Sequence, residues 1–86
     1  MSARRALFSR QGATFEVVKV TDDIVWIRDL DRECSITNDA ERVCDELAIE
    51  YGERRIIYRD TDGSWDELVH EHGRFLAFAP ARGTAP

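Results

Sequence analysis

The chain has 86 residues and a formal net charge of −5, with 43% hydrophobic and 34% charged side chains. This length suits one domain and leaves no room for a second core. The composition is globular rather than disordered. A domain this small has little interior that could be hollowed out for a large cofactor, so we expect none.

The charge is unevenly distributed along the chain. Residues 1–13 contain three arginines and no acid, whereas residues 14–79 contain 17 acidic and 8 basic side chains, a net of −9. An acidic body repels nucleic-acid phosphates and anionic lipid, which argues against direct binding to either. The charge favours a protein partner that presents a basic surface.

Targeting signals and a disulfide framework are not expected. No apolar run follows the arginines near the start, and no segment approaches the roughly 20 apolar residues of a membrane span. Cys34 and Cys44 are too few for a secreted disulfide scaffold. The sequence therefore predicts a cytoplasmic protein.

The first predicted elements form a β-hairpin. Residues 15–20 and 24–27 are rich in β-branched and aromatic side chains, with a polar turn at residues 21–23. Trp26 and Val25 fall on opposite faces of the second strand, so both faces are apolar and the strand should be central. Residues 1–13, before the hairpin, read as a flexible basic arm.

Residues 39–51 predict an amphipathic helix, after a turn at 29–33 and a short extended piece at 34–36. Asn38 followed by Glu41 matches a capping box, and Gly52 suits the C-terminal stop. The apolar positions repeat with the period of one buried helix face. They are Ala40, Val43, Cys44, Leu47, Ala48 and Tyr51.

Three further strands are expected at residues 54–59, 64–70 and 74–79, joined by glycine-containing turns. Residues 80–86 read as a flexible tail. The predicted fold is therefore α+β, with one domain over residues 14–79. It has an antiparallel sheet of about five strands in ββαβββ order and the helix packed on one face.

The candidate metal-binding residues do not have the spacing of known sites. The segment 60–64 resembles the start of a calcium loop, but Glu71, its twelfth position, lies beyond a whole predicted strand. Zinc-type ligands are present without a C-x₂-C or H-x₃₋₅-H spacing. They are Cys34, Cys44, His70 and His72. We expect no metal site.

Catalytic motifs are also missing from the sequence. Asp66 and Glu67 are adjacent on a predicted strand, so their carboxylates should point to opposite faces of the sheet. There is no glycine-rich phosphate loop and no hydrolase or metalloprotease signature. We therefore expect the protein not to be an enzyme.

The outer face of the predicted helix is the best candidate for a binding site. At 100° per residue, Ile49 lies directly opposite Ala40 and the buried stripe. A single exposed isoleucine is common, but one surrounded by charges resembles a small hot spot with a polar rim. The predicted protein-binding residues are Arg42, Asp45, Glu46, Ile49 and Glu53.

Three stretches carry a resemblance to known sequences. They are Ser35–Glu41 (SITNDAE), Arg55–His70 (RIIYRDTDGSWDELVH) and Phe75–Pro80 (FLAFAP). Together they resemble a group of small, uncharacterised proteins of phages and proteobacterial chromosomes. The resemblance implies a phage or mobile-element setting, where small acidic proteins often inhibit host machinery, as anti-CRISPR proteins do. It implies no catalytic residue.

Two alternatives to a partner-binding module stay open. The first is a self-associating structural module, a homodimer built through an open sheet edge or through the face that bears Trp26 or Trp65. The second is a small enzyme, because catalytic side chains can assemble from distant positions in the chain.

Overall fold

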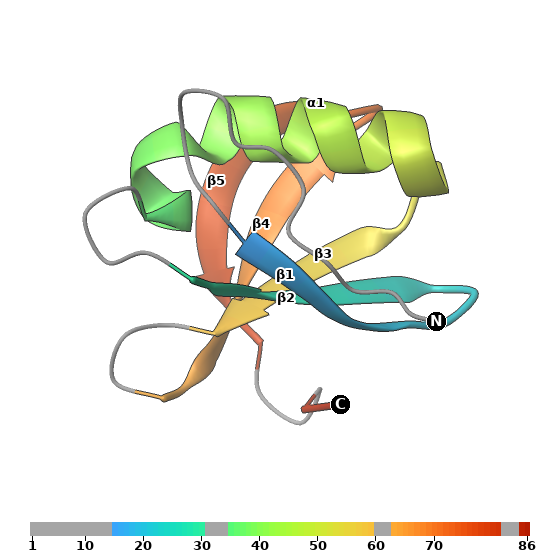
Figure 1. The fold of residues 1–86 in the computed structure, drawn as a ribbon. Coiled ribbons are helices and arrows are strands. Elements are labelled where there is room, and N and C mark those ends of the chain that lie inside the picture. Colours follow the sequence, from blue (N-terminus) through green and yellow to red (C-terminus); the bar gives the residue numbers. More distant parts are fainter. Residues whose placement is uncertain (1–14, 31–34, 60–62, 82–84) are drawn as a thin grey trace.

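In the computed structural model, which describes residues 15–30, 35–59, 63–81 and 85–86, one helix lies across one face of a five-stranded sheet (Figure 1). This confirms the α+β class, the single domain and the one helix. The elements in chain order are β1 (Phe15–Val20), β2 (Ile24–Asp29), the 3₁₀ helix η1 (Ile36–Asp39), α1 (Ala40–Tyr51), β3 (Arg55–Arg59), β4 (Trp65–Glu71) and β5 (Arg74–Pro80).

The sheet is mixed, so the expectation of a purely antiparallel sheet was wrong. Its strands lie side by side in the order β1-β2-β3-β4-β5. The pairing is antiparallel except between β2 and β3, which run parallel with Ile24 opposite Arg55 and Arg28 opposite Arg59. The reason is the helix between these strands, since a crossover helix returns the chain to the sheet end from which it left. The prediction that β2 is a central strand is confirmed.

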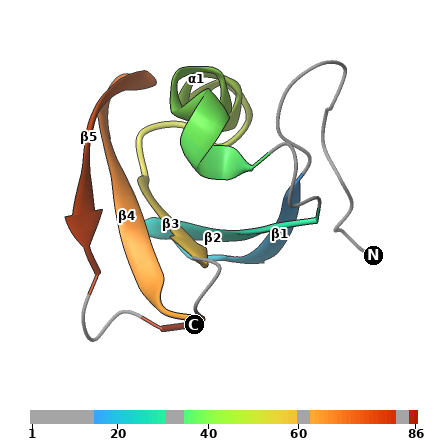
Figure 2. The same cartoon turned by 90° about the vertical axis from the view of Figure 1, so that its left-hand side faces the viewer.

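The sheet bends around the helix. Figure 2 looks along α1 and shows β4 and β5 rising beside the helix while β1 to β3 lie beneath it. The pairing register shifts between Val17 and Lys19 on β1, and between Val69 and His70 on β4. Such irregularities bend a strand and increase its twist. The curvature lets a short helix cover most of one sheet face.

The main core lies between α1 and the sheet. The predicted helix stripe is confirmed at its centre, because Ala40, Val43, Cys44 and Leu47 are all buried. They pack on apolar side chains from the strands and from η1. Those partners are Phe15, Val25, Ile27, Ile36, Ile56, Tyr58 and Leu68.

The start of the helix differs from the expected capping box. Asn38 lies within η1, and neither η1 nor α1 has a side-chain hydrogen bond at its N-cap. Ile36, expected in an extended piece, is the first residue of η1 and is buried. Its backbone N–H donates to Asp29 Oδ1 at 2.7 Å. The carboxylate that ends β2 therefore sets where the helical segment begins.

A smaller apolar cluster lies on the other face of the sheet. Trp26, Ile57 and Ala81 are buried there, with Ile24 and Trp65 packed against them. The strand β5 runs to Pro80, and Ala81 is only 4% exposed, so the folded body extends beyond the boundary expected at residue 79. Residues 1–13, expected to be a flexible arm, lie outside the described residues.

The turn between β4 and β5 touches the helix. His72 and Gly73 both have positive φ angles, 52° and 87°. This pair matches the tight hairpin turn expected there. A side chain at Gly73 would come within 3.0 Å of Ala48 Cβ, so the turn packs closely against α1. Gly63, in the glycine-containing turn expected before β4, has a positive φ angle of 91°.

Candidate interaction surfaces

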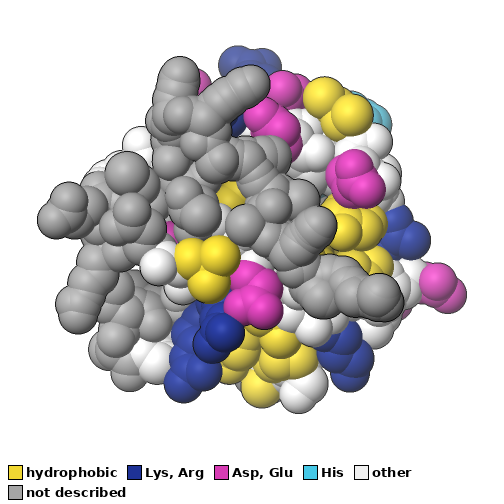
Figure 3. All heavy atoms as spheres, viewed as in Figure 1, with side chains coloured by type: hydrophobic (Ala, Val, Ile, Leu, Met, Phe, Trp, Pro, Cys, Tyr) yellow, Lys and Arg dark blue, Asp and Glu magenta, His cyan; other side chains and the backbone are white. Residues whose placement is uncertain are grey.

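The outer face of α1 is acidic and has an isoleucine at its centre. Residues 39–53 contain six acidic side chains and one basic side chain, a net of −5. Ile49 is 79% exposed, the highest value among the large hydrophobic side chains described. Asp45, one helical turn before Ile49, and Glu50, the residue after it, are also exposed. Figure 3 shows acidic groups gathered over α1.

Arg42 is the only basic residue of this helix, and two carboxylates offset its charge. Its Nε lies 3.6 Å from Asp39 Oδ2, and its Nη1 lies 3.8 Å from Glu46 Oε2. These are helix pairs at spacings of three and four residues, and such pairs stabilise a helix modestly. The remaining surface charge of the helix is therefore negative.

Glu53 is placed differently from the other predicted binding residues. It follows Gly52, beyond the end of α1, and both of its carboxylate oxygens accept from the backbone N–H of His72, at 3.1 and 3.2 Å. Glu53 Oε1 also lies 3.2 Å from His72 Nδ1. This carboxylate helps to hold the β4–β5 turn. The structure thus brings Arg42, Asp45, Glu46 and Ile49 together on one helix, with Glu53 at the adjoining turn.

The candidate zinc ligands have other roles where they are described. Burial raises the pKa of the Cys44 thiol to about 12, so this side chain stays protonated. His70 Nε2 lies 2.7 Å from Arg54 O, and His70 Nδ1 accepts from Gly73 N at 3.0 Å. Within the described residues no group of three or more histidine, cysteine or acidic side chains could hold a metal. Cys34 and the turn at 60–62 lie outside those residues.

The two adjacent carboxylates of β4 point to different faces of the sheet, as predicted. Asp66 is opposite Tyr58, which belongs to the core under α1. Glu67 is opposite Ile57, which belongs to the cluster on the other face. Glu67 also accepts two hydrogen bonds from Arg55, at 2.9 and 3.2 Å. These two carboxylates do not face a common substrate.

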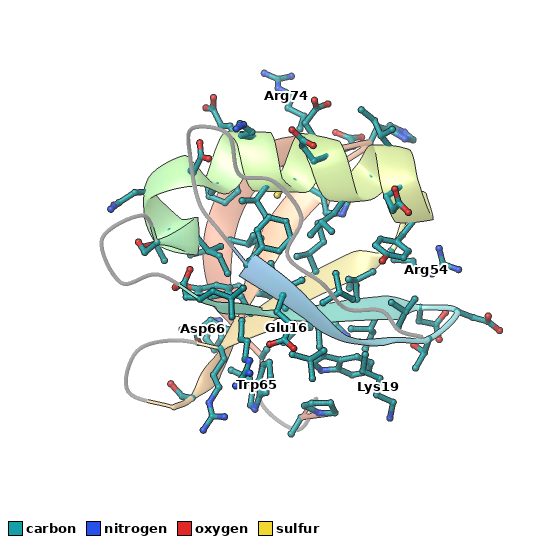
Figure 4. The ribbon with its side chains drawn as sticks, in the orientation of Figure 1. Glu16, Lys19, Arg54, Trp65, Asp66 and Arg74 are labelled. Atoms are coloured by element: carbon teal, nitrogen blue, oxygen red, sulfur yellow. The ribbon has the colours of Figure 1, made fainter. Side chains whose placement is uncertain are left out.

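The sheet face opposite α1 carries a basic and aromatic surface that sequence reasoning missed. Lys19 Nζ lies 5.3 Å from the ring centroid of Trp26, and the Arg59 guanidinium lies 5.9 Å from that of Trp65. Figure 4 shows Glu16, Lys19 and Trp65 on the side of the sheet away from α1. In Figure 3 basic groups flank a hydrophobic group on this lower side. The surface depends on how four strands pair, which no local pattern encodes.

The edge strand β5 exposes apolar side chains. Leu76 is 53% exposed and Phe78 is 48% exposed. From Phe75 to Pro80 the strand contains no charged residue. Phe78 is only partly covered by ring contacts with Phe75 and Tyr58, at centroid distances of 4.8 and 6.2 Å. Natural edge strands usually carry charges that discourage pairing with other chains, and this segment lacks them.

Comparisons with protein-family models, curated proteins and solved structures find no match to this chain. Among the described segments, no helix has both the length and the apolar character that a membrane crossing requires.

Proposed function

We propose that this protein is a non-enzymatic binding module that uses the outer face of α1 to occupy a basic surface of another protein. The observation that carries the proposal is the concentration of charge. The segment 39–53 has a net charge of −5, equal to the formal charge of the whole chain, around an isoleucine that is 79% exposed. An apolar centre with a charged rim is a common arrangement for a binding hot spot.

The electrostatics suit a basic partner. The charges at the rim speed association and suppress wrong partners, while desolvation of the apolar centre slows dissociation. The resemblance to phage and proteobacterial proteins suggests the setting of the partner. A host protein that binds nucleic acid has a basic surface, and an acidic helix can occupy that surface as an anti-CRISPR-type inhibitor does. This step rests on the resemblance alone.

The experiment begins with capture of bound proteins from a host lysate, and then tests the captured partner against variants of the helix face. The reversal Asp45→Lys with Glu50→Lys changes two exposed carboxylates that make no ion pair or hydrogen bond within the described structure. We leave Glu53 intact because it holds the β4–β5 turn. The double reversal should weaken binding about tenfold or more, since attraction becomes repulsion. Ile49→Asp should do the same by placing a charge in the desolvated centre.

A matched control reverses the same number of charges elsewhere. Asp22→Lys with Glu71→Lys changes two exposed carboxylates in or next to other turns of the sheet, with the same change in net charge. This control should retain most of the affinity, and circular dichroism should show that every variant is folded. If the control loses as much affinity as the helix variants, only net charge matters. If folded helix variants bind like the parent, α1 is not the interface.

Self-association through β5 is a second candidate function, favoured by the uncharged and exposed edge described above. Two copies of β5 paired antiparallel would cover Leu76 and Phe78 and extend the sheet. Light scattering after size exclusion should then show a dimer at micromolar concentration that is insensitive to salt. Leu76→Lys should return it to a monomer, whereas Val18→Lys, on the opposite edge strand, should not. A wild-type monomer across this concentration range removes the candidate.

A further inference from the structure

Two arginines lie side by side on the sheet face opposite α1. The parallel register makes Arg28 and Arg59 direct partners on β2 and β3. On the outer sides of this pair, Arg28 is opposite Glu16 on β1, and Arg59 is opposite Trp65 on β4. Like charges directly opposite each other destabilise a sheet, so this pair gains from a nearby anion.

Within the described part of the chain, one carboxylate pairs with these cations. Arg28 Nε donates to Glu16 Oε1 at 2.7 Å. Arg59 lies over the ring of Trp65, and Lys19 lies over the ring of Trp26. Neither makes an ion pair with a carboxylate of the described residues. A guanidinium over an aromatic ring keeps its edge N–H groups available for an oxyanion.

A hollow of about 470 Å³ lies beside these groups. That volume is within the range of small-molecule sites, roughly 300–1,000 Å³. Its lining includes three cations, Lys19, Arg28 and Arg59, and one carboxylate, Glu16. The rest is largely apolar and comes from β1, from Tyr51 and from Trp65. Val18 and Val20 in this lining are 43% and 38% exposed. Val17 and Tyr51 pack against the core under α1, so the hollow reaches around the edge strand β1 from the face that bears the arginines.

We propose that this hollow binds a small phosphomonoester with an apolar or aromatic body. Guanidinium groups match phosphate oxygens in geometry as well as charge, which places the phosphate between Arg28 and Arg59. The body of the ligand lies against Trp65, which lines the hollow on the same sheet face as the two arginines. Tyr51 at the end of α1 lines the hollow, whereas the exposed Asp45 and Glu50 do not, and salt screens their charges over a Debye length of about 8 Å at physiological ionic strength. A long nucleic acid would reach beyond the cations into the acidic surroundings, which favours a small ligand.

The test uses phenyl phosphate and inorganic phosphate as probes at constant ionic strength. Binding is followed by the NMR shift of the Trp65 indole N–H. Phenyl phosphate should cause a saturable shift and bind about tenfold tighter than inorganic phosphate, because its ring buries apolar surface. Arg28→Gln and Arg59→Gln should each weaken binding about tenfold. Arg74→Gln is the matched control, since Arg74 is an exposed arginine at the start of β5 and does not line the hollow.

Three results would overturn the proposal. They are a shift of Trp65 that does not saturate, an equal loss of affinity in the Arg74→Gln control, and equal affinity for the two probes. The Asp45→Lys and Glu50→Lys variant should bind phenyl phosphate as the parent does. The anion site and the helix interface can therefore fail independently of each other.

Discussion

At the scale of single residues, the helix has one buried face and one exposed face. Substitutions on these two faces should differ in their effect on the free energy of unfolding. Leu47 is 2% exposed and Ile49 is 79% exposed, although both are large aliphatic side chains two positions apart. Leu47→Ala leaves a cavity in the main core and should cost about 2–4 kcal/mol of unfolding free energy. Ile49→Ala should change it by less than about 0.5 kcal/mol. Urea melts of both variants test this, and a larger loss for Ile49→Ala would contradict the placement of the helix.

Cys44 gives a prediction about reactivity and pH. Burial raises the pKa of this thiol from 9.0 to about 12. With Cys34→Ser as background, Cys44 should react with a thiol reagent at pH 8 only as fast as the protein unfolds, because the thiolate is the nucleophile. The unfolded state loses its proton above about pH 9, whereas the folded state keeps it up to about pH 12. The contribution of this thiol to stability is therefore complete below about pH 9 and is lost as the pH rises towards 12.

The control for this prediction is Cys44→Ala in the same background. It should lose less stability between pH 9 and pH 11 than its parent, because other alkaline groups are common to both proteins. Rapid labelling of the native thiol, or parallel pH profiles of the two proteins, would show that Cys44 is accessible to solvent.

At the scale of elements, the helix and every strand could be predicted to within two residues at each end, because each has a clear period and ends at turn residues. The way the helix start is held, including the 3₁₀ turn before it, and the parallel pairing of β2 with β3 could not be predicted. Asn38 and Glu41 fit a capping pattern, but Ile36 is buried in η1 and Asp29 binds its N–H, so tertiary contacts decide the start. The parallel pairing of β2 and β3 had one signal in the sequence, namely a helix predicted between two consecutive apolar strands.

The β4–β5 turn gives a prediction at this scale. Gly73 and Gly63 have similar φ angles, 87° and 91°, but different surroundings. An added Cβ at Gly73 would lie 3.0 Å from Ala48 Cβ and 3.4 Å from Asp45 Cα, whereas at Gly63 its contact among the described residues is the end of the Arg59 side chain, at 3.6 Å. Both alanine substitutions should cost about 1 kcal/mol for the positive φ angle. Gly73→Ala should cost at least about 1 kcal/mol more, because it pushes the turn away from α1.

Thermal melts of the two alanine variants provide the measurement. Gly63→Ala serves as the control for backbone strain, so only the difference between the variants reports the contact with the helix. Equal losses would mean that the turn moves away from α1 without cost, and the close packing of β5 beside the helix would then be in doubt.

At the scale of the whole molecule, the outer face of α1 is acidic, whereas the sheet face opposite α1 carries a basic surface. Only the acidic face could be predicted from the sequence. The acidic helix face follows from the helical period, which is local to residues 39–53. The basic face brings Lys19, Arg28 and Arg59 together from three strands. The neighbouring position of the two arginines depends on the parallel register, which an antiparallel pairing of β2 and β3 would not produce.

The last prediction concerns how the two apolar clusters unfold. They lie on opposite faces of one sheet and share its central strands: Trp26 and Val25 are adjacent on β2, and Ile57 and Ile56 on β3, one of each pair in each cluster. Neither cluster can lose its strands without disrupting the other, so the domain should unfold in one cooperative step. Tryptophan fluorescence reports on the smaller cluster, because Trp26 and Trp65 both belong to it. Circular dichroism of the helix reports on the larger one.

Urea transitions followed by these two signals should therefore coincide. Ala81→Asp tests the coupling further, because Ala81 is 4% exposed and a buried carboxylate there would cost several kcal/mol. This substitution should move both transitions to lower urea by the same amount, whereas Ala77→Asp, at an exposed site on β5, should move neither by much. If Ala81→Asp shifts only the fluorescence transition, the face opposite α1 unfolds on its own. The anion site proposed there would then need a separate account of its stability.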